Sequence, residues 1–321
     1  MLNFLFLSGG MALILFSAGW LVEGASSVAK KAGISDLVIG LTVVALGTSA
    51  PELSVNIFSA LSGATDIAFG NILGSNISNI LLILGVSSII YPLRIGADTK
   101  WKEIPFSLLA ALVLGIMAND VMIDGSKNGD FLTRADGLLL LSFFIIFLAY
   151  TFFVALKGNI DHSEPEEEVK TVPVHKSILL IICGLAGLFI GGKYLVDGAV
   201  NIARIIGLSE RVIGITIIAV GTSLPELATS AVAAWKKKAD IAVGNVIGSN
   251  IFNIFLILGV TSVICPVSAN SGINVDIGMV IFASLILFIT AYTFKRSSID
   301  RVEGGIFVAV YFSYITYLLL L

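Results

Sequence analysis

The stretch Gly47-Thr48-Ser49-Ala50-Pro51-Glu52-Leu53 decides the fold, because it recurs as Gly221-Thr222-Ser223-Leu224-Pro225-Glu226-Leu227 within a second long apolar run. The two copies agree at six of seven positions and lie 174 residues apart. The same offset relates a second motif, residues 66–76, to residues 240–250 without a gap. A carboxylate at the centre of a bilayer costs roughly 2.5 kcal/mol or more, so each buried glutamate indicates a functional site. The chain is therefore a duplicated membrane unit.

The composition is that of a helical membrane protein. Of 321 residues, 57% are hydrophobic and 13% are charged, about half the charge of an average soluble domain, and the mean hydropathy is +1.00. The net charge of −3 and the lack of a basic tract argue against a nucleic-acid partner. The loops are too short for a soluble domain and no obligatory protein partner is evident, so the lipid bilayer is the expected environment.

Apolar runs between polar breaks predict an all-α polytopic membrane protein with ten transmembrane helices. The predicted helices cover about 3–28, 37–61, 67–91, 103–119, 132–156, 177–203, 211–235, 241–264, 275–294 and 302–320. We expect a first five-helix repeat at 1–156, an acidic cytoplasmic linker at 157–176 and a second five-helix repeat at 177–321. A solvated linker is the plainer interpretation of the acidic run, with a regulatory cation site as the alternative.

Lysine and arginine residues predict the orientation, because positive charge stays on the cytoplasmic side. Connections on one side carry 14 of the 19 basic residues and those on the other side carry 4, with Lys193 inside a helix. Both termini should therefore be extracytoplasmic. Since each repeat has an odd number of helices, the second repeat enters the membrane inverted relative to the first. Many secondary transporters are built from such inverted repeats, with substrate sites near the midplane where the repeats meet.

The first motif places oxygen atoms beside a buried acid. Thr48 and Ser49 lie four and three residues before Glu52, so all three share one helix face. Pro51 cannot donate to the carbonyl of Gly47 and should kink the helix there. A freed carbonyl survives in a membrane only where protein, water or an ion satisfies it. Hydroxyl, carbonyl and carboxylate oxygens thus converge in a setting that suits a hard cation. The equivalent residues of the second copy are Thr222, Ser223, Glu226, Pro225 and Gly221.

The second motif adds neutral oxygen atoms. Its glycines, four residues apart in each copy, allow a neighbouring backbone to approach closely. Ser75 and Asn79 form an i, i+4 pair that faces the same cavity, and Ser249 and Asn253 form another. The two glutamates supply a charge of −2, which neutralises one calcium ion or is shared by two or three sodium ions with neutral ligands. Because either ion can balance the same charge of −2, we expect calcium and sodium to compete for overlapping sites and to exchange there.

Other interpretations of these residues are open. A buried glutamate can be protonated and hydrogen-bonded for helix association, although this would have to occur twice in the same sequence frame. The serines and asparagines of the second motif can connect helices instead of binding an ion, and Asn71 and Asn245 fit either role. Lys193 and Asp197, four residues apart in the sixth predicted helix, fit an interfacial ion pair better than a gate.

The paired motifs resemble the two alpha-repeats of the cation/calcium antiporter superfamily, specifically its prokaryotic sodium/calcium exchanger branch. The resemblance covers the whole chain in length, ten-span topology and central acidic linker, and is most specific at 40–86 and 214–260. The calcium/proton exchanger branch usually shows Gly-Asn-x-x-Glu where this chain has Gly-Thr-Ser-x-Pro-Glu, which favours sodium as the coupling ion. The resemblance also implies that the first and sixth helices slide across the site to alternate access.

The resemblance implies a metal site with a role for each residue. Calcium would bind between Glu52 and Glu226 with help from Thr48 and Thr222. Sodium sites nearby would use four serines and two backbone carbonyls, namely Ser49, Ser75, Ser223, Ser249 and the carbonyls of Ala45 and Ala219. Some relatives carry an aspartate where this chain has Asn79 or Asn253, and in potassium-dependent exchangers that acid is associated with potassium transport. We therefore expect no potassium requirement, and no cofactor besides the transported calcium and sodium ions.

The predicted function is a secondary active antiporter that exchanges sodium for calcium across the inner (plasma) membrane by alternating access. Antiport of calcium, or another cation, against protons is the alternative. A cation channel conducts without a counter-ion, and the inverted duplication disfavours it. A membrane-embedded hydrolase needs a nucleophile–base pair or a metal triad. No histidine falls within a predicted span, so we expect no enzyme activity.

Overall fold

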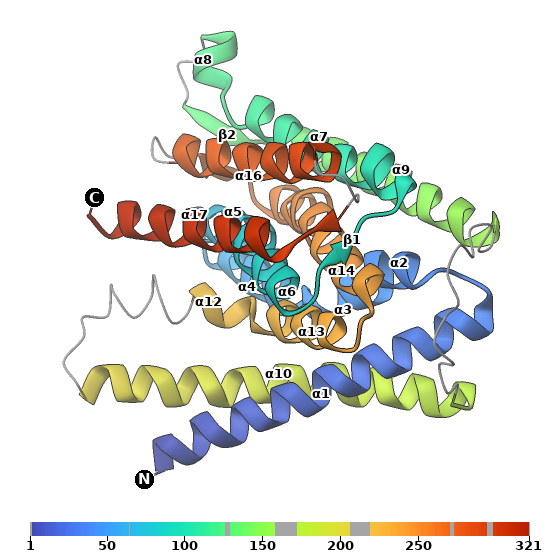
Figure 1. Ribbon diagram of the computed structural model, residues 1–321. Coiled ribbons are helices and arrows are strands. Elements are labelled where there is room, and N and C mark those ends of the chain that lie inside the picture. The colour runs from blue at the N-terminus through green and yellow to red at the C-terminus, as the bar shows by residue number, and fades with distance from the viewer. Residues whose placement is uncertain are drawn as a thin grey trace.

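A computed structural model describes residues 2–63, 65–125, 129–157, 172–205, 219–269, 273–293 and 298–320. Figure 1 shows these segments as a bundle of helices with short strands at its edges. Seven of the described helices are long and apolar enough to cross a membrane, or eight if the bent pair Asp36–Thr48 and Ala50–Ser62 counts as one span. The protein is therefore an all-helical polytopic membrane protein, as the sequence predicts.

The helices of the first half follow the predicted apolar runs, with some turns wound as π-helix, labelled η. The first two runs correspond to α1 (Leu2–Ala32) and to a broken helix composed of α2 (Asp36–Ile39), η1 (Gly40–Val44), α3 (Ala45–Thr48) and α4 (Ala50–Ser62). The other three correspond to α5 (Thr65–Ile77) with η2 (Ser78–Leu84) and α6 (Gly85–Ile90), to η3 (Thr99–Glu103) with α7 (Ile104–Met117), and to α9 (Arg134–Lys157). A short helix, α8 (Asp120–Asp124), lies between the last two.

The second half repeats this order. Its described helices are α10 (Val174–Ile205), α12 (Ala219–Thr222) followed by α13 (Leu224–Trp235), α14 (Ala239–Ile251) with η5 (Phe252–Leu258) and α15 (Gly259–Ile264), α16 (Ile273–Thr293) and α17 (Arg301–Leu320). Most of the predicted linker at 157–176 lies outside the described residues. Within the described part, Lys157 ends α9 and Val174 begins α10, so both helices extend a few residues beyond their predicted ends.

Two short antiparallel strand pairs join the halves, and the sequence did not predict them. In the first pair, β1 (Leu93–Arg94) is hydrogen-bonded to β4 (Ser298–Ile299), and in the second, β2 (Asp130–Leu132) is bonded to β3 (Val267–Ala269). Leu93 pairs with Ile299, and both side chains are fully buried. Each pair takes one strand from each half, so the two halves are connected at the ends of the bundle as well as along it.

The helices that carry the second motif form the centre of the bundle. In the spans Ile67–Ile90 and Ala239–Ile264, 78% of the residues in the apolar stretch are buried inside the protein. In the other candidate spans the share is 22–33%. Ile72 of α5 and Val246 of α14 are among the fully buried core residues. These two spans therefore face protein on nearly all sides, and their polar residues must find partners within the bundle.

Aromatic contacts hold the first half against the central span of the second half. Phe143 of α9 stacks on Phe255 of η5 with 5.3 Å between ring centroids. Phe144, the next residue of α9, meets Phe252 edge to face at 5.0 Å. Conversely, helix α17 of the second half packs against α6 and η2, which belong to the central span of the first half. The two halves are thus interlocked instead of lying as separate domains.

The predicted close approach at the glycines of the second motif is confirmed in its second copy. A Cβ added at Gly244 would lie 2.7 Å from the carbonyl oxygen of Leu37, and one added at Gly248 would lie 2.7 Å from that of Leu41. At Gly70 and Gly74, no described atom lies within 4 Å of an added Cβ. The residues equivalent to Leu37 and Leu41 in the second half, 211 and 215, lie outside the described residues.

Helices α1 and α10 cross each other along one side of the bundle, and α7 and α16 lie on the opposite side (Figure 1). Glycines at the crossing allow backbone-to-backbone contact. A Cβ added at Gly10 of α1 would lie 2.8 Å from the carbonyl oxygen of Gly191, and one added at Gly184 of α10 would lie 2.8 Å from the amide nitrogen of Leu21. Such distances exclude any larger side chain unless the helices separate.

This crossing predicts a stability difference between adjacent glycines. Gly10→Leu should lower the free energy of unfolding by about 1–3 kcal/mol, because the new side chain forces α1 away from α10. Gly9→Leu is the matched control, since nothing lies within 4 Å of a Cβ added there. The measurement is the melting temperature of the purified protein in detergent. Equal melting temperatures for the two variants would contradict the packing described for α1 and α10.

Candidate cation site

A break in each of two helices positions the glutamates of the repeated heptapeptide. Ser49, between α3 and α4, has φ −81° and ψ 7°, and Ser223, between α12 and α13, has φ −87° and ψ 6°. The first helix bends by 46° at its break, which confirms the kink predicted from Pro51. Glu52 and Glu226 consequently lie in the first turns of α4 and α13. The positive end of a helix dipole favours a carboxylate at that position.

The two glutamates are buried and receive hydroxyl hydrogen bonds. Each side chain is 1% exposed. The Ser75 hydroxyl donates to Glu52 Oε1 at 2.9 Å, and the Ser49 hydroxyl donates to Glu226 Oε1 at 3.2 Å. The second bond runs from the first half of the chain to the second.

A serine of the second motif links the two heptapeptides. The hydroxyl oxygens of Ser75 and Ser223 are 3.0 Å apart and hydrogen-bonded. A serine has one hydroxyl proton, and Ser75 donates its proton to Glu52, so Ser223 is the donor in this pair. Ser75 therefore links a glutamate of the first half with a serine of the second. Its equivalent, Ser249, is fully buried, and its hydroxyl has no hydrogen-bond partner in the described part of the chain.

Each glutamate also has an oxygen without a partner. Among the described residues, Oε2 of Glu52 and Oε2 of Glu226 are buried and accept no hydrogen bond. An unpaired buried carboxylate oxygen is costly, and a native protein keeps one only for a reason such as an ion or a reaction. The arrangement thus fits a cation that both carboxylates contact. Calcium and sodium, which prefer oxygen ligands, suit this set of donors.

Thr48 is held beside the site by an asparagine of the second motif. Its hydroxyl donates to Asn245 Oδ1 at 3.0 Å and approaches the Ala45 carbonyl at 3.3 Å. The Asn245 amide donates to the Ser230 hydroxyl at 2.9 Å and to the Glu226 carbonyl at 3.4 Å. Of the two roles that the sequence leaves open for Asn245, the structure shows the connection between helices. Asn71, its equivalent, has a buried amide nitrogen with no partner in the described structure.

The remaining candidate ligands differ in how the structure places them. Asn79 and Asn253 lie in η2 and η5, and both are 1% exposed. The Ala45 carbonyl accepts the Ser49 amide proton at 3.0 Å in addition to the Thr48 contact. Ala219 begins α12, and its side chain is outside the described part. Hydrogen bonds connect Ser75 with Glu52 and Ser223, and Ser49 with Glu226, whereas the Ser249 hydroxyl is buried without a partner among the described residues.

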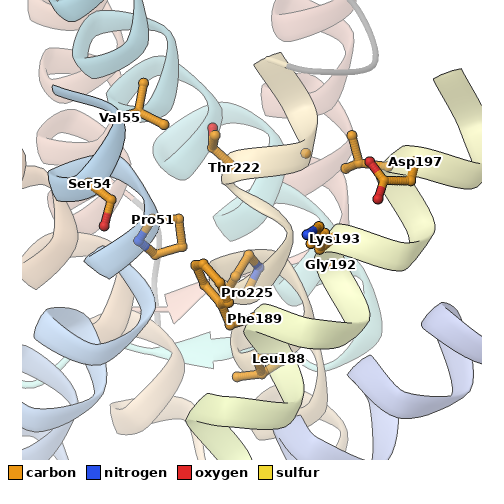
Figure 2. Close-up of a pocket in the computed structure, with 12 residues that line it drawn as sticks. Pro51, Ser54, Val55, Leu188, Phe189, Gly192, Lys193, Asp197, Thr222 and Pro225 are labelled. Atoms are coloured by element: carbon orange, nitrogen blue, oxygen red, sulfur yellow. The ribbon is translucent and has the colours of Figure 1, made fainter. Parts of the chain in front are cut away.

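A cavity of about 260 Å³ lies between α4, α10 and the α12–α13 break (Figure 2). Pro51 and Pro225, the neighbours of the two glutamates in sequence, line it together with Thr222. Lys193 and Asp197 of α10 line the same cavity. In the described structure no ion pair joins these two side chains, so the ion pair predicted from their spacing is wrong. The helix spacing allowed the contact, but both side chains lie exposed at the cavity.

Sequence reasoning missed two residues beside the site. Asn76 and Asn250 lie at equivalent positions of the second motif and are 0% and 2% exposed. Each is hydrogen-bonded to an asparagine of the other half. The signal that indicates them is their identity in both copies at the 174-residue offset, next to the serines proposed as ligands.

Comparison with known proteins places the chain in a family. The family model described as "Sodium/calcium exchanger protein" matches residues 2–153 and 176–320. The putative antiporter CaxA of Alkalimonas amylolytica is 39% identical, with 97% of this chain and 96% of CaxA covered. The sodium/calcium exchanger MaX1 of Methanosarcina acetivorans is 33% identical over 98% of both chains. The inner membrane protein YrbG of Escherichia coli is 37% identical over 80% of this chain and 78% of YrbG.

The solved structure of the sodium-calcium exchanger NCX_Mj has the same fold. It superimposes with a TM-score of 0.82 at 34% identity and covers 98% of each chain. The family model matches the two halves as separate segments, and the solved structure shares the helical fold over nearly the whole chain. The chain therefore belongs to the sodium/calcium exchanger protein family, a family of membrane cation transporters and not of enzymes.

Proposed function

We propose that the protein is a secondary active antiporter that exchanges sodium for calcium across the cytoplasmic membrane by alternating access. One observation carries the proposal: two buried glutamates, one from each half, each keep a carboxylate oxygen without a partner among the described residues. The inner-membrane description of YrbG and the sodium-calcium exchanger description of NCX_Mj support the location and the ion pair.

The proposed topology has ten transmembrane helices in two inverted repeats, at 1–156 and 177–321, with a cytoplasmic linker at 157–176. The 14-to-4 division of basic residues supports the orientation. Helix α1 begins and α17 ends at the same end of the bundle, as expected for an even number of crossings (Figure 1). Both termini would then be extracytoplasmic. The η3–α7 helix and the broken helix ending in α13 supply the two spans beyond the eight candidates.

The proposed calcium site lies between Glu52 and Glu226, with the hydroxyl oxygens of Thr48 and Thr222. The burial of both carboxylates and the position of Thr222 at the cavity support this site. The two glutamates supply a charge of −2, which matches one calcium ion. Asn79 and Asn253 add neutral oxygens and no further charge. Two of the residues that line the cavity, Pro51 and Pro225, precede the two glutamates in sequence, which supports the cavity as the proposed route of the ions to the site.

The proposed sodium sites share atoms with the calcium site. They use the hydroxyls of four serines and two carbonyls, those of Ser49, Ser75, Ser223, Ser249, Ala45 and Ala219. Two of these hydroxyls donate to the glutamates, and a third is bonded to one of those two. A cation that takes a hydroxyl oxygen as ligand displaces or reorients these contacts, so calcium and sodium compete for the same groups. Competition at shared ligands is the physical basis of exchange.

Glu52→Gln and Glu226→Gln should each reduce calcium uptake by roughly 30-fold or more, because losing one partner of a buried ionic contact costs about 2–5 kcal/mol. The measurement is radioactive calcium uptake into proteoliposomes loaded with sodium. Glu103→Gln is the matched control, since Glu103 is also buried, with one oxygen bonded to Tyr150 and Oε2 without a partner among the described residues, but it lies outside the two motifs. Full uptake by either glutamate variant, or equal loss in the control, would contradict the shared calcium site.

A counter-ion panel distinguishes the coupling ions in one assay. Calcium uptake should follow an imposed sodium gradient. It should be unchanged when a potassium or proton gradient is added while the sodium gradient is kept the same. The reason for the potassium result is that neutral Asn79 and Asn253 occupy the positions where potassium-dependent relatives carry acid. Uptake that ignores sodium and follows a proton gradient would support calcium/proton antiport instead. Uptake that persists with no exchangeable ion on the opposite side would support a channel.

A further inference from the structure

Four buried asparagines form a closed amide network at the centre of the bundle. They are Asn76, Asn79, Asn250 and Asn253, each at most 2% exposed. Asn79 Nδ2 donates to Asn250 Oδ1, and Asn253 Nδ2 donates to Asn76 Oδ1, both at 2.9 Å. Asn76 Nδ2 donates to the backbone carbonyl of Asn250, and Asn250 Nδ2 donates to that of Asn76, both at 3.4 Å. Every one of these bonds crosses between the two halves.

The backbone carbonyls in this network determine which way each side-chain amide points. A carbonyl oxygen only accepts, so Asn76 must present its NH₂ group to the carbonyl of Asn250. Its Oδ1 then faces Asn253, which must in turn present its own NH₂ group. The same reasoning from the carbonyl of Asn76 fixes Asn250 and then Asn79. An asparagine can reverse its amide by rotation about one bond, and here the network allows one orientation.

This orientation leaves two carbonyl oxygens available for a ligand. Oδ1 of Asn79 and Oδ1 of Asn253 are buried and have no hydrogen-bond partner among the described residues. Asn79 lies four residues after Ser75, whose hydroxyl contacts Glu52, so the two share a helix face. Asn253 has the same relation to Ser249. Both asparagines occupy π-helical turns, which recur at functional sites.

We propose that Asn76 and Asn250 are positioning residues that hold the amide oxygens of Asn253 and Asn79 toward the transported cation. The inference rests on the proposed function, because it concerns ligands of the same site. A reversed amide would present two N–H donors to a cation and repel it. Each half therefore orients a neutral ligand that belongs to the other half. Partners of this kind behind a metal ligand typically change cation affinity by about 10–100-fold.

A double-mutant cycle tests whether Asn76 acts through Asn253. Asn253→Ala should raise the calcium concentration for half-maximal uptake about tenfold, and Asn76→Ala should raise it by a similar factor. The double variant should stay near tenfold instead of reaching about 100-fold, because residues that act through one group are not additive. Asn250→Ala with Asn79→Ala gives the equivalent cycle if Asn76→Ala does not fold.

Asn119→Ala is the control, since the Asn119 amide also donates to a carbonyl, that of Gly115 at 2.7 Å, but lies outside the network. It should leave the half-maximal concentration unchanged. Effects of Asn76→Ala and Asn253→Ala that multiply, or a loss confined to maximal uptake, would overturn the positioning role. A second measurement of the same cycle uses the melting temperature of the purified variants. It gives the concentrations of calcium and of sodium that are needed to raise that temperature.

The two measurements, calcium uptake and ion-dependent melting temperature, distinguish a failure of the inference from a failure of the proposed function. Wild-type protein without sodium-driven calcium uptake would overturn the proposed function, and the melting curves would still decide whether Asn76 acts through Asn253. Wild-type protein that neither calcium nor sodium stabilises would overturn both. Wild-type uptake together with multiplying effects of the two substitutions would overturn only the positioning role.

Discussion

Two carboxylates buried inside a membrane protein are the constraint on which the rest of the structure depends. Each needs favourable surroundings in a region without bulk water, and the fold supplies them in three ways. The helix breaks at Ser49 and Ser223 place each glutamate in a first helical turn. Serine hydroxyls donate to one oxygen of each carboxylate. The most buried spans, α5–η2–α6 and α14–η5–α15, surround the site with protein. The glutamates are thus polar groups around which an apolar bundle is built.

The two halves are equivalent in sequence but not in their contacts. Ser75 connects Glu52 with Ser223, whereas its counterpart Ser249 has no hydrogen-bond partner among the described residues. Thr48 and Asn245 are bonded to each other, and the amide nitrogen of Asn71 has no such partner. The serine and threonine contacts of the two copies therefore differ, whereas the asparagine contacts of the second motif are symmetric between the halves.

Much of the fold, and part of the site, could be predicted from the sequence. Apolar runs located the helices, and Pro51 located the kink, because both effects are local. The contact between Ser49 and Glu226 links residues far apart in the chain, but the repeated motif made their proximity predictable. The strand pairs, the π-helical turns and the network of Asn76 with Asn253 were not predictable. The strand pairs and the asparagine network depend on packing between segments more than about 130 residues apart, which no local pattern reports.

The strand pairs bear on how the protein is made. Both β1 and β2 belong to the half that is synthesised first, and their partners β4 and β3 belong to the other half. At 5–20 residues per second, translation of the second family segment, 176–320, takes roughly 7–30 s. During that interval the first half lies in the membrane with two unpaired strand edges, and Glu52 lacks its second-half neighbours. Both strand pairs can therefore form only after the second half has been synthesised.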